Sequence, residues 1–297
     1  MLCDMDNRML ALGTVQFGMS YGVANRRGQV DSAEANAILD RARGAGMDTL
    51  DTAMTYGTSE ESLGSVGVDT WRVVSKLPAL PDPCPDVGGW VRRATEASLG
   101  RLRLGRLGAL LLHAPQDLRS ANGEALYAAL LALRQDGLVD KIGISIYDPE
   151  ELAALDGLRF DLIQAPFNII DRRLAESGWL DALRRAGVEI HVRSLFLQGL
   201  LLMRLDQRPS GFARWQELWD LWHRWLQESG LSAIEACLGF AAAHPQIDRM
   251  VVGVDGLGQL EEILRARIPA AVHPPSELSS DDADLVNPSR WVAGPHR

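Results

Sequence analysis

The sequence predicts an α/β protein built as a single (β/α)8 TIM barrel, and three observations support this fold. About eight short apolar segments alternate with helical segments along the chain. These apolar segments lack the two-residue alternation of half-exposed strands, as expected for parallel strands buried on both faces. The glycine fingerprint GxGxxG of doubly wound sheets is absent. Repeated strand–helix alternation is typical of the barrel, and no linker divides residues 1–297 into further domains.

In the first half of the chain, apolar runs and their flanking residues mark each element. Asp31 and Ser32 are typical first residues of a helix, and glycines at 44 and 46 end that helix. Pro78 ends the third strand and opens a proline-rich loop. We expect strands at residues 9–17, 49–52, 72–76 and 109–113, and helices at 31–46, 60–66, 90–102 and 124–135.

The second half continues the alternation, with one long interruption. Residues 200–248 contain FARWQELWDLWHRW, which places Trp215, Trp219 and Trp222 on one helical face, with Leu218 and Trp225 nearby. This helix is expected to pack on the barrel or at a dimer contact, and a lid is the alternative. We expect strands at residues 141–145, 162–165, 189–194 and 249–252, and helices at 149–155, 179–186, 232–244 and 260–267.

Composition excludes several classes of function. The formal net charge of −9 argues against broad nucleic-acid binding, which needs a basic surface. The first residues lack a signal-peptide pattern, and the longest apolar stretch, at 195–203, is too short to span a bilayer. No HExxH motif or paired cysteine spacing supports a metal site. Cys3, Cys84 and Cys237 are scattered and odd in number, so we expect a reducing cytoplasm and no disulfide framework.

Four chemically distinct side chains follow the ends of three successive strands. Asp51, Lys76 and His113 lie at these strand ends, and Tyr56 lies in the loop after the first of them. Each of these residues alone is more often a cap, an ion pair or a packing residue. Because the carboxyl ends of barrel strands open into one mouth, their joint placement predicts a shared active site.

The four residue types suit proton donation to a carbonyl group. A tyrosine has a reference pKa of about 10, and a nearby ammonium such as Lys76 is expected to lower the pKa of Tyr56. Asp51 is expected to hold the charge of the buried lysine. His113 can donate a hydrogen bond that orients and polarises a carbonyl oxygen. Such a site lacks only a source of hydride.

The motifs around these residues resemble the aldo-keto reductase superfamily over nearly the whole chain. The segment GMDTLDTAMTYGTSEESLG resembles the family's Asp–Tyr signature, while SKLP and LLLHAP resemble its lysine and histidine motifs. The resemblance implies that Asp51, Tyr56, Lys76 and His113 form the catalytic tetrad, with Tyr56 as general acid and base. It also implies reversible hydride transfer between a nicotinamide cofactor and an aldehyde or ketone, without metal.

The resemblance also assigns cofactor positions, with two departures. Ser145 and Gln164 match the positions that bind the nicotinamide amide, but Ile146 replaces the usual asparagine. Arg193 replaces a tyrosine whose ring commonly stacks on the nicotinamide, and a guanidinium can stack likewise. The stretch expected to hold the pyrophosphate contains Ser194, Leu197 and Gly199, and Gly13–Thr14 offers close backbone approach to a ligand.

The last motif, VVGVDGLGQLEEI, resembles the segment around the adenosine 2′-phosphate. It presents Gly253, Asp255, Gln259 and Glu262, with no cation before Arg265. An acid near this position favours a free ribose hydroxyl over a phosphate. The expected cofactor is therefore NADP(H) or NAD(H), with NAD or dual use left open.

The leading hypothesis is an NAD(P)-dependent carbonyl reductase or alcohol dehydrogenase acting on a small molecule, with a sugar or keto-sugar as first expectation. One alternative is a nucleotide-retaining barrel that epimerises a sugar or eliminates a group from it without net redox. Another is a non-catalytic nucleotide-sensing partner subunit. A monomer or homodimer is expected, without nucleic-acid or membrane partners. The expected pocket walls are residues 78–90, the tryptophan helix and residues 287–291. Arg26, Arg27 and Arg193 suit an anionic group, but surface salt pairing is the expected role of Arg26 and Arg27.

Overall fold

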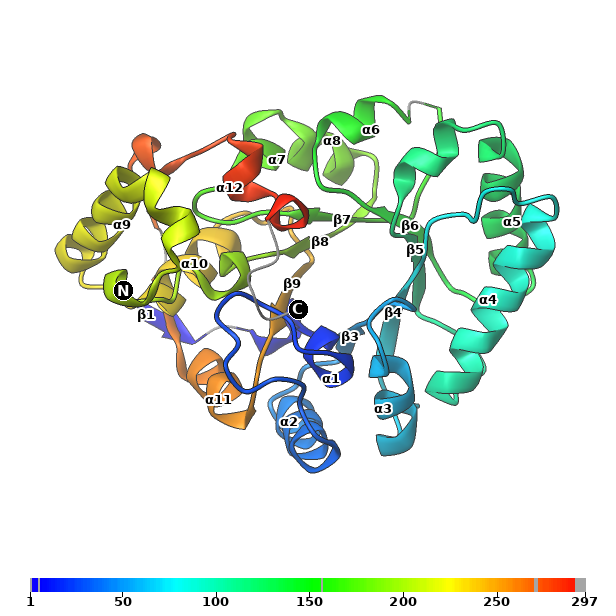
Figure 1. Cartoon of the computed structure of the whole chain (residues 1–297), viewed down its shortest axis with the longest axis horizontal. Coiled ribbons are helices and arrows are strands. Elements are labelled where there is room, and N and C mark those ends of the chain that lie inside the picture. The colour runs from blue at the N-terminus through cyan, green and yellow to red at the C-terminus, as the bar shows by residue number, and fades with distance from the viewer. Residues whose placement is uncertain (1, 5, 156, 270–271, 292–297) are drawn as a thin grey trace.

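The computed structural model describes residues 2–4, 6–155, 157–269 and 272–291, and eight parallel strands form a closed barrel at its centre (Figure 1). The strands follow chain order around the barrel, and the last pairs with the first at Gly13 and Gly253. The predicted fold class is confirmed. The barrel strands are β2 (Leu10–Gly13), β3 (Thr49–Asp51), β4 (Arg72–Leu77), β5 (Ala109–Leu112), β6 (Ile142–Ser145), β7 (Leu162–Pro166), β8 (Glu189–Arg193) and β9 (Arg249–Gly253).

Helices surround the barrel and occupy the predicted intervals between strands (Figure 1). Within the described residues, none is long and apolar enough to cross a membrane. The helices are α1 (Val15–Gly18), α2 (Ser32–Gly44), α3 (Ser59–Val66), α4 (Val87–Leu102), α5 (Gly123–Gln135), α6 (Glu150–Ala153), α7 (Arg173–Glu176), α8 (Trp179–Arg185), α9 (Gln216–Ser229), α10 (Ala233–Ala242), α11 (Leu257–Arg265) and α12 (Ala283–Val286).

The prediction of one strand over residues 9–17 is wrong in its second half. The strand stops at Gly13, and Val15–Gly18 form the short helix α1. The backbone N–H and the hydroxyl of Thr14 both donate to the carbonyl of Asp51, which draws the chain across the barrel end. The sequence also gave no sign of a small antiparallel sheet, β1 (Leu2–Asp4) with β10 (Arg267–Pro269), which lies outside the barrel.

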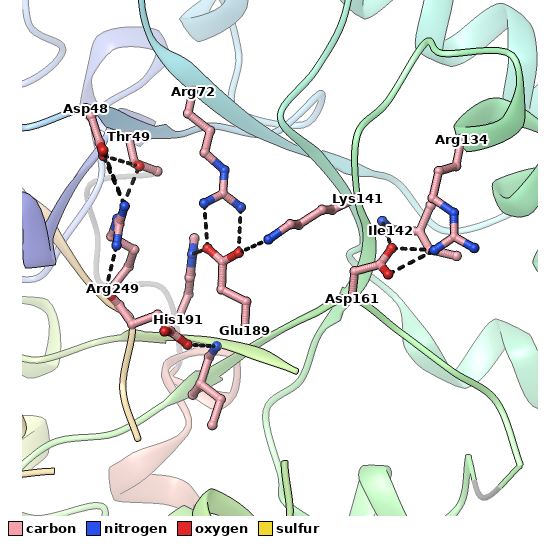
Figure 2. A network of polar contacts seen from close by, with 12 residues as sticks. Asp48, Thr49, Arg72, Arg134, Lys141, Ile142, Asp161, Glu189, His191 and Arg249 are labelled. Carbon is pink, nitrogen blue, oxygen red and sulfur yellow. Dashed lines mark hydrogen bonds and ion pairs between the residues drawn. The ribbon is translucent and has the colours of Figure 1, made fainter. Parts of the chain in front are cut away.

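A polar network fills the amino-terminal end of the barrel (Figure 2). The carboxylate of Glu189 contacts Arg72 at 2.7 Å, Lys141 at 2.5 Å and the Nε2 atom of His191 at 2.7 Å. Burial alone would raise the pKa of Glu189, but the three hydrogen bonds outweigh it and hold this pKa well below its usual range. At this end of a barrel, such contacts stabilise the fold.

Inward-facing side chains form successive layers from this polar network to the opposite, carboxyl-terminal mouth of the barrel. Residues two apart on a strand face the same side, so Arg72, Val74 and Lys76 follow one another along the barrel. The middle layer is a buried apolar cluster of Val74, Ala109, Leu111 and Leu162. Above it, Lys76 is charged and only 1% exposed. The apolar middle therefore separates a structural polar network from a second, carboxyl-terminal one.

The predicted tryptophan helix is present and packs against the short helical segments Leu205–Gln207, Ser210–Trp215 and Ser276–Leu278. Trp219 and Trp222 on α9 are fully buried, and their indole N–H groups donate to the carbonyls of Phe212 and Leu201. Trp215 instead caps the start of the helix and donates to Asp282 at 3.0 Å. Buried indoles that satisfy their polar atoms on backbone identify a fixed supporting helix.

Candidate active site

A buried ion pair forms the base of the carboxyl-terminal mouth. The Nζ atom of Lys76 donates to both carboxylate oxygens of Asp51, at 2.8 and 2.7 Å, and to the carbonyl of Thr52 at 2.9 Å. These three bonds use every proton of the ammonium group. Gln164 adds a fourth contact, because its Nε2 atom donates to Asp51 at 2.7 Å and its Oε1 atom accepts from Ser145 at 3.2 Å. The Asp51 carboxylate is thus held by groups from two other strands, β4 and β7.

Tight backbone packing positions the loop that carries Tyr56. Gly18 lies against this loop, and a Cβ atom on it would stand 1.8 Å from the Tyr56 carbonyl and 2.4 Å from the Ser59 nitrogen. The hydroxyl of Ser59 donates to the carbonyl of Thr14 at 2.8 Å. The following helix is anchored by Glu60, whose buried carboxylate accepts from serines of β4 and α4 and pairs with an arginine of α4. The end of β2 and the start of α3 therefore fix Tyr56 over the barrel.

Tyr56 and His113 face each other across the mouth. Their rings meet edge to face with centroids 6.0 Å apart, and the Lys76 Nζ atom lies 5.0 Å from the centroid of the tyrosine ring. No hydrogen bond to the Tyr56 hydroxyl occurs among the described residues. The Nδ1 atom of His113 lies 3.3 Å from the Thr55 hydroxyl. Both rings thus keep a polar edge available to a ligand.

The expectation that Lys76 lowers the pKa of Tyr56 is wrong for this structure. Burial and the negative charge of Asp51 raise the pKa of Tyr56. Lys76 donates its ammonium protons to Asp51 and Thr52 and none to the Tyr56 hydroxyl. Burial, together with Lys76 and Arg193, lowers the pKa of His113 to about 4. At neutral pH the site therefore holds a protonated phenol and an uncharged imidazole.

An elongated cavity of about 400 Å³ opens above these residues. Asp51, Tyr56 and His113 line one end, and Gln259 and Glu262 of α11 line the other. A cavity of this kind, with a few polar groups converging on an apolar surface, is typical of small-molecule sites. The four predicted catalytic residues are brought together at one end of it.

Comparison with known proteins identifies the family. The sequence model of the Aldo/keto reductase family matches residues 9–272. The chain belongs to the aldo/keto reductase family. Its members are enzymes and are generally NAD(P)H-dependent oxidoreductases. No curated protein sequence is significantly similar to the chain.

Solved structures agree with the family assignment. A Pseudomonas aeruginosa protein, provisionally named an aldo-keto reductase, is 25% identical with a TM-score of 0.63, and the match covers 86% of this chain and 87% of that one. The aldo-keto reductase AKR11C1 from Bacillus halodurans, in its holo form, is 22% identical with a TM-score of 0.70. That match covers 91% of this chain and 89% of the other, and at this identity it supports the fold alone.

The aldo-keto reductase cavity includes most of the predicted cofactor positions but not all. Ser145 and Gln164 are buried, bonded to each other and not part of the cavity lining, and the side chain of Leu197 is also fully buried. These three differ from the prediction because their side chains point into the barrel or the packed loop. The predicted positions that line the cavity are Gly13, Thr14, Arg193, Ser194, Gly199, Gly253, Asp255, Gln259 and Glu262.

The expectation that no cation lies near the last motif, at the adenosine end of the cofactor, is incomplete. Arg265 pairs with Glu261 and lies outside the cavity lining, but the first loop supplies Arg26 to the lining and brings the Arg27 guanidinium against Gly256 of the last motif. Arg27 pairs with Glu34 at 3.7 Å, which confirms the expected salt pairing for this residue. Sequence reasoning confined to one motif missed a cation that a distant loop supplies.

The cavity walls also differ from those predicted. Residues 78–90, the tryptophan helix and residues 287–291 do not contribute to the lining. The loop after β2 and the loop after β8 take their place, with Tyr21, Asn25, Gln198, Leu202 and Met203. The glycine- and asparagine-containing composition of residues 21–30 was the one available signal, but it does not show which way the loop folds.

Proposed function

We propose that the chain is an NAD(P)H-dependent oxidoreductase that interconverts an aldehyde or ketone and its alcohol, with Tyr56 as general acid and base. The observation that carries the proposal is the pairing of a protonated Tyr56 with a neutral His113 beside a neutralised Asp51–Lys76 pair. In carbonyl reduction, the Tyr56 hydroxyl gives its proton to the carbonyl oxygen. His113 donates a hydrogen bond that orients this oxygen.

The residues along the cavity fit a nicotinamide dinucleotide. Gln16 is 8% exposed and lines the cavity, and its Oε1 atom has no hydrogen-bond partner among the described residues. A Cβ atom at Gly253 would lie only 3.0 Å from the Gln16 amide, so glycine leaves room there. When bound, the cofactor supplies the hydride. The residues proposed to hold it are Gly13, Thr14, Arg193, Ser194, Gly199, Gly253, Asp255, Gln259 and Glu262.

Ser145 and Gln164 have a different proposed role. The Arg193 guanidinium donates to the backbone carbonyl of Ile146 at 2.8 Å, next to Ser145. Because Gln164 is committed to Asp51, we propose that this pair positions the catalytic carboxylate.

Mixed charge at the adenosine end leads us to propose use of both NADH and NADPH. Asp255 and Glu262 disfavour a 2′-phosphate, whereas Arg27, which lies against Gly256, favours it. Burial raises the pKa of Asp255, while hydrogen bonds from Gln259 and Gln16 oppose this shift. Replacing Asp255 by alanine is expected to strengthen NADPH binding relative to NADH. An unchanged affinity ratio in Asp255→Ala contradicts this assignment.

The proposed function is tested by titrating the protein with NADPH and NADH while nicotinamide fluorescence is followed. Saturable binding of either is expected in the wild type and in Tyr56→Phe, because the phenol acts on the carbonyl. Turnover of a carbonyl panel should be lost in Tyr56→Phe. If neither nucleotide binds and no carbonyl compound oxidises the cofactor, the proposal is wrong.

Arg193 motivates a second candidate, a non-net-redox reaction on a sugar with retained nucleotide. A cation near the cofactor differs from the ring expected there and alters the balance between its oxidised and reduced forms. Product formed with no net change in nicotinamide absorbance would favour this candidate over a reductase. Nucleotide binding with neither kind of turnover would leave the nucleotide-sensing subunit.

A further inference from the structure

Arg193 is a fixed cation at the catalytic end of the cavity. It ends strand β8 and lines the cavity together with Tyr56 and His113. Its guanidinium stacks on Tyr147 at 4.4 Å from the ring centroid. Its Nη2 atom donates to the carbonyl of Ile146 at 2.8 Å, and its Nη1 atom donates to the Ser194 hydroxyl at 3.3 Å. Stacking and hydrogen bonding together limit the rotamers of this side chain.

The positive charge of Arg193 has no counter-charge nearby. In the part of the chain that the structure describes, no carboxylate forms an ion pair with it. Asp51 is already neutralised by Lys76 at 2.7 Å, and His113 is uncharged at neutral pH because its pKa is about 4. The acidic residues of the lining, Asp255 and Glu262, belong to the last motif at the other end. The catalytic end therefore carries an excess of one positive charge.

The donors that remain on Arg193 match a planar anion. A guanidinium has five N–H groups, and the two recorded bonds leave three of them for a ligand. Tyr21 lines the same part of the cavity, and its hydroxyl accepts from Gln198 at 2.9 Å, which leaves its own proton to donate. Burial raises the pKa of Tyr21 to about 12, so the hydroxyl keeps this proton. One fixed cation and one hydroxyl suit a group with a single negative charge.

We infer that the substrate is a carbonyl compound that carries a carboxylate, such as an oxo acid or a sugar acid, and that Arg193 and Tyr21 bind this carboxylate. The inference rests on the proposed reductase function and names its substrate class. Hydride adds to the carbonyl carbon, the Tyr56 proton goes to the oxygen, and the carboxylate is unchanged. The role of the carboxylate is to neutralise Arg193 and to orient the carbonyl group toward Tyr56 and His113.

The test compares matched substrates that differ only in charge. kcat/KM is measured at saturating NADPH, or NADH if that cofactor binds better, for 4-oxobutanoate against 4-oxobutanamide and for D-glucuronate against D-glucuronamide. The variants are Arg193→Met, Arg193→Lys and Tyr21→Phe. Arg204→Met is the control. The Arg204 side chain is 77% exposed, pairs with Asp206 and lies outside the cavity lining.

The wild type is expected to prefer the carboxylate of each pair by about 10- to 100-fold, the range for a hydrogen-bonded charge. Arg193→Met should abolish most of this preference through a higher KM for the acids, Arg193→Lys should restore part of it, and Arg204→Met should keep it. Equal kcat/KM for acid and amide in the wild type overturns the inference. So does an Arg193→Met variant that slows acid and amide equally and keeps the preference between them, because Arg193 then serves the cofactor alone. If no carbonyl compound reacts and no nucleotide binds, the proposed function itself fails.

Discussion

Removing one charge from the Asp51–Lys76 pair tests how the active site is held. The side chains of Lys76 and Asp51 are 1% and 6% exposed, and they share two hydrogen bonds. Asp51→Asn preserves the shape but leaves a buried ammonium without a counter-charge. Breaking a buried pair in this way costs about 3–5 kcal/mol of the free energy of unfolding. Lys76→Met leaves the opposite charge and is expected to cost a similar amount.

The cost converts to a measurable shift in melting temperature. At about 2.1 cal/mol/K per residue, a chain of 297 residues has an unfolding entropy of about 0.6 kcal/mol/K. Each single variant should therefore melt about 5–8 °C below the wild type. The double variant Asp51→Asn/Lys76→Met contains no charge in the pair. Its melting temperature should fall by much less than the sum of the decreases in the two single variants. Circular dichroism at neutral pH measures all four proteins.

The pH dependence gives an independent check. Burial lowers the pKa of Lys76, and Asp51 opposes this shift. Without Asp51 the folded pKa falls further below the unfolded value, so folding releases a proton. Stability then rises with pH, and the deficit of Asp51→Asn should shrink between pH 7 and about pH 10, the unfolded lysine pKa. Additive shifts in the double variant, or an Asp51→Asn melting temperature within about 2 °C of wild type, would refute this account of the pair.

Three further perturbations test other parts of the structure. Gly18→Ala places a Cβ atom 1.8 Å from the backbone carbonyl of Tyr56, so turnover should fall severely. The control is Gly100→Ala, at a position in α4 with open space around it. This variant should be neutral or should raise the free energy of unfolding by about 0.5–1 kcal/mol. Enzyme assays and thermal melts on both alanine variants separate a displaced loop from a general glycine effect. His113→Ala should lower kcat by about 10²–10³, with a smaller loss in His113→Gln, and because the pKa of His113 is about 4, no His113 step should appear in the pH–rate profile between about pH 5 and 7. Glu189→Gln leaves several cations without their acid and should cost about 3–5 kcal/mol at neutral pH. The carboxyl pKa of Glu189 is depressed, so its contribution is complete above the unfolded value of about 4.3 and is lost as the pH falls. The variant's melting temperature should therefore fall less than that of wild type from pH 5 to pH 3, and parallel curves would contradict the role of Glu189.

The sequence by itself determined the barrel and the end of it at which the candidate active site lies. Buried parallel strands followed by helices leave few alternative topologies, and their carboxyl ends necessarily meet at one mouth. Asp51, Lys76 and His113 lie at such ends, so their proximity follows from chain order. The Lys76–Asp51 contact of 2.7 Å is the direct result of adjacent strands β3 and β4.

Only the tertiary structure decided which side chains reach the cavity and which proton each one holds. Arg27 approaches Gly256 of the last motif because the loop after β2 folds back towards it, and loop paths depend on contacts far away in the sequence. Gln164 turns to Asp51 at 2.7 Å and lies outside the cavity lining, although its strand position suggested a ligand contact. The pKa of Tyr56 rises because the phenol is buried and lies near the Asp51 carboxylate. Strand order sets which groups meet, whereas hydrogen-bond geometry at the scale of one bond length sets their charge.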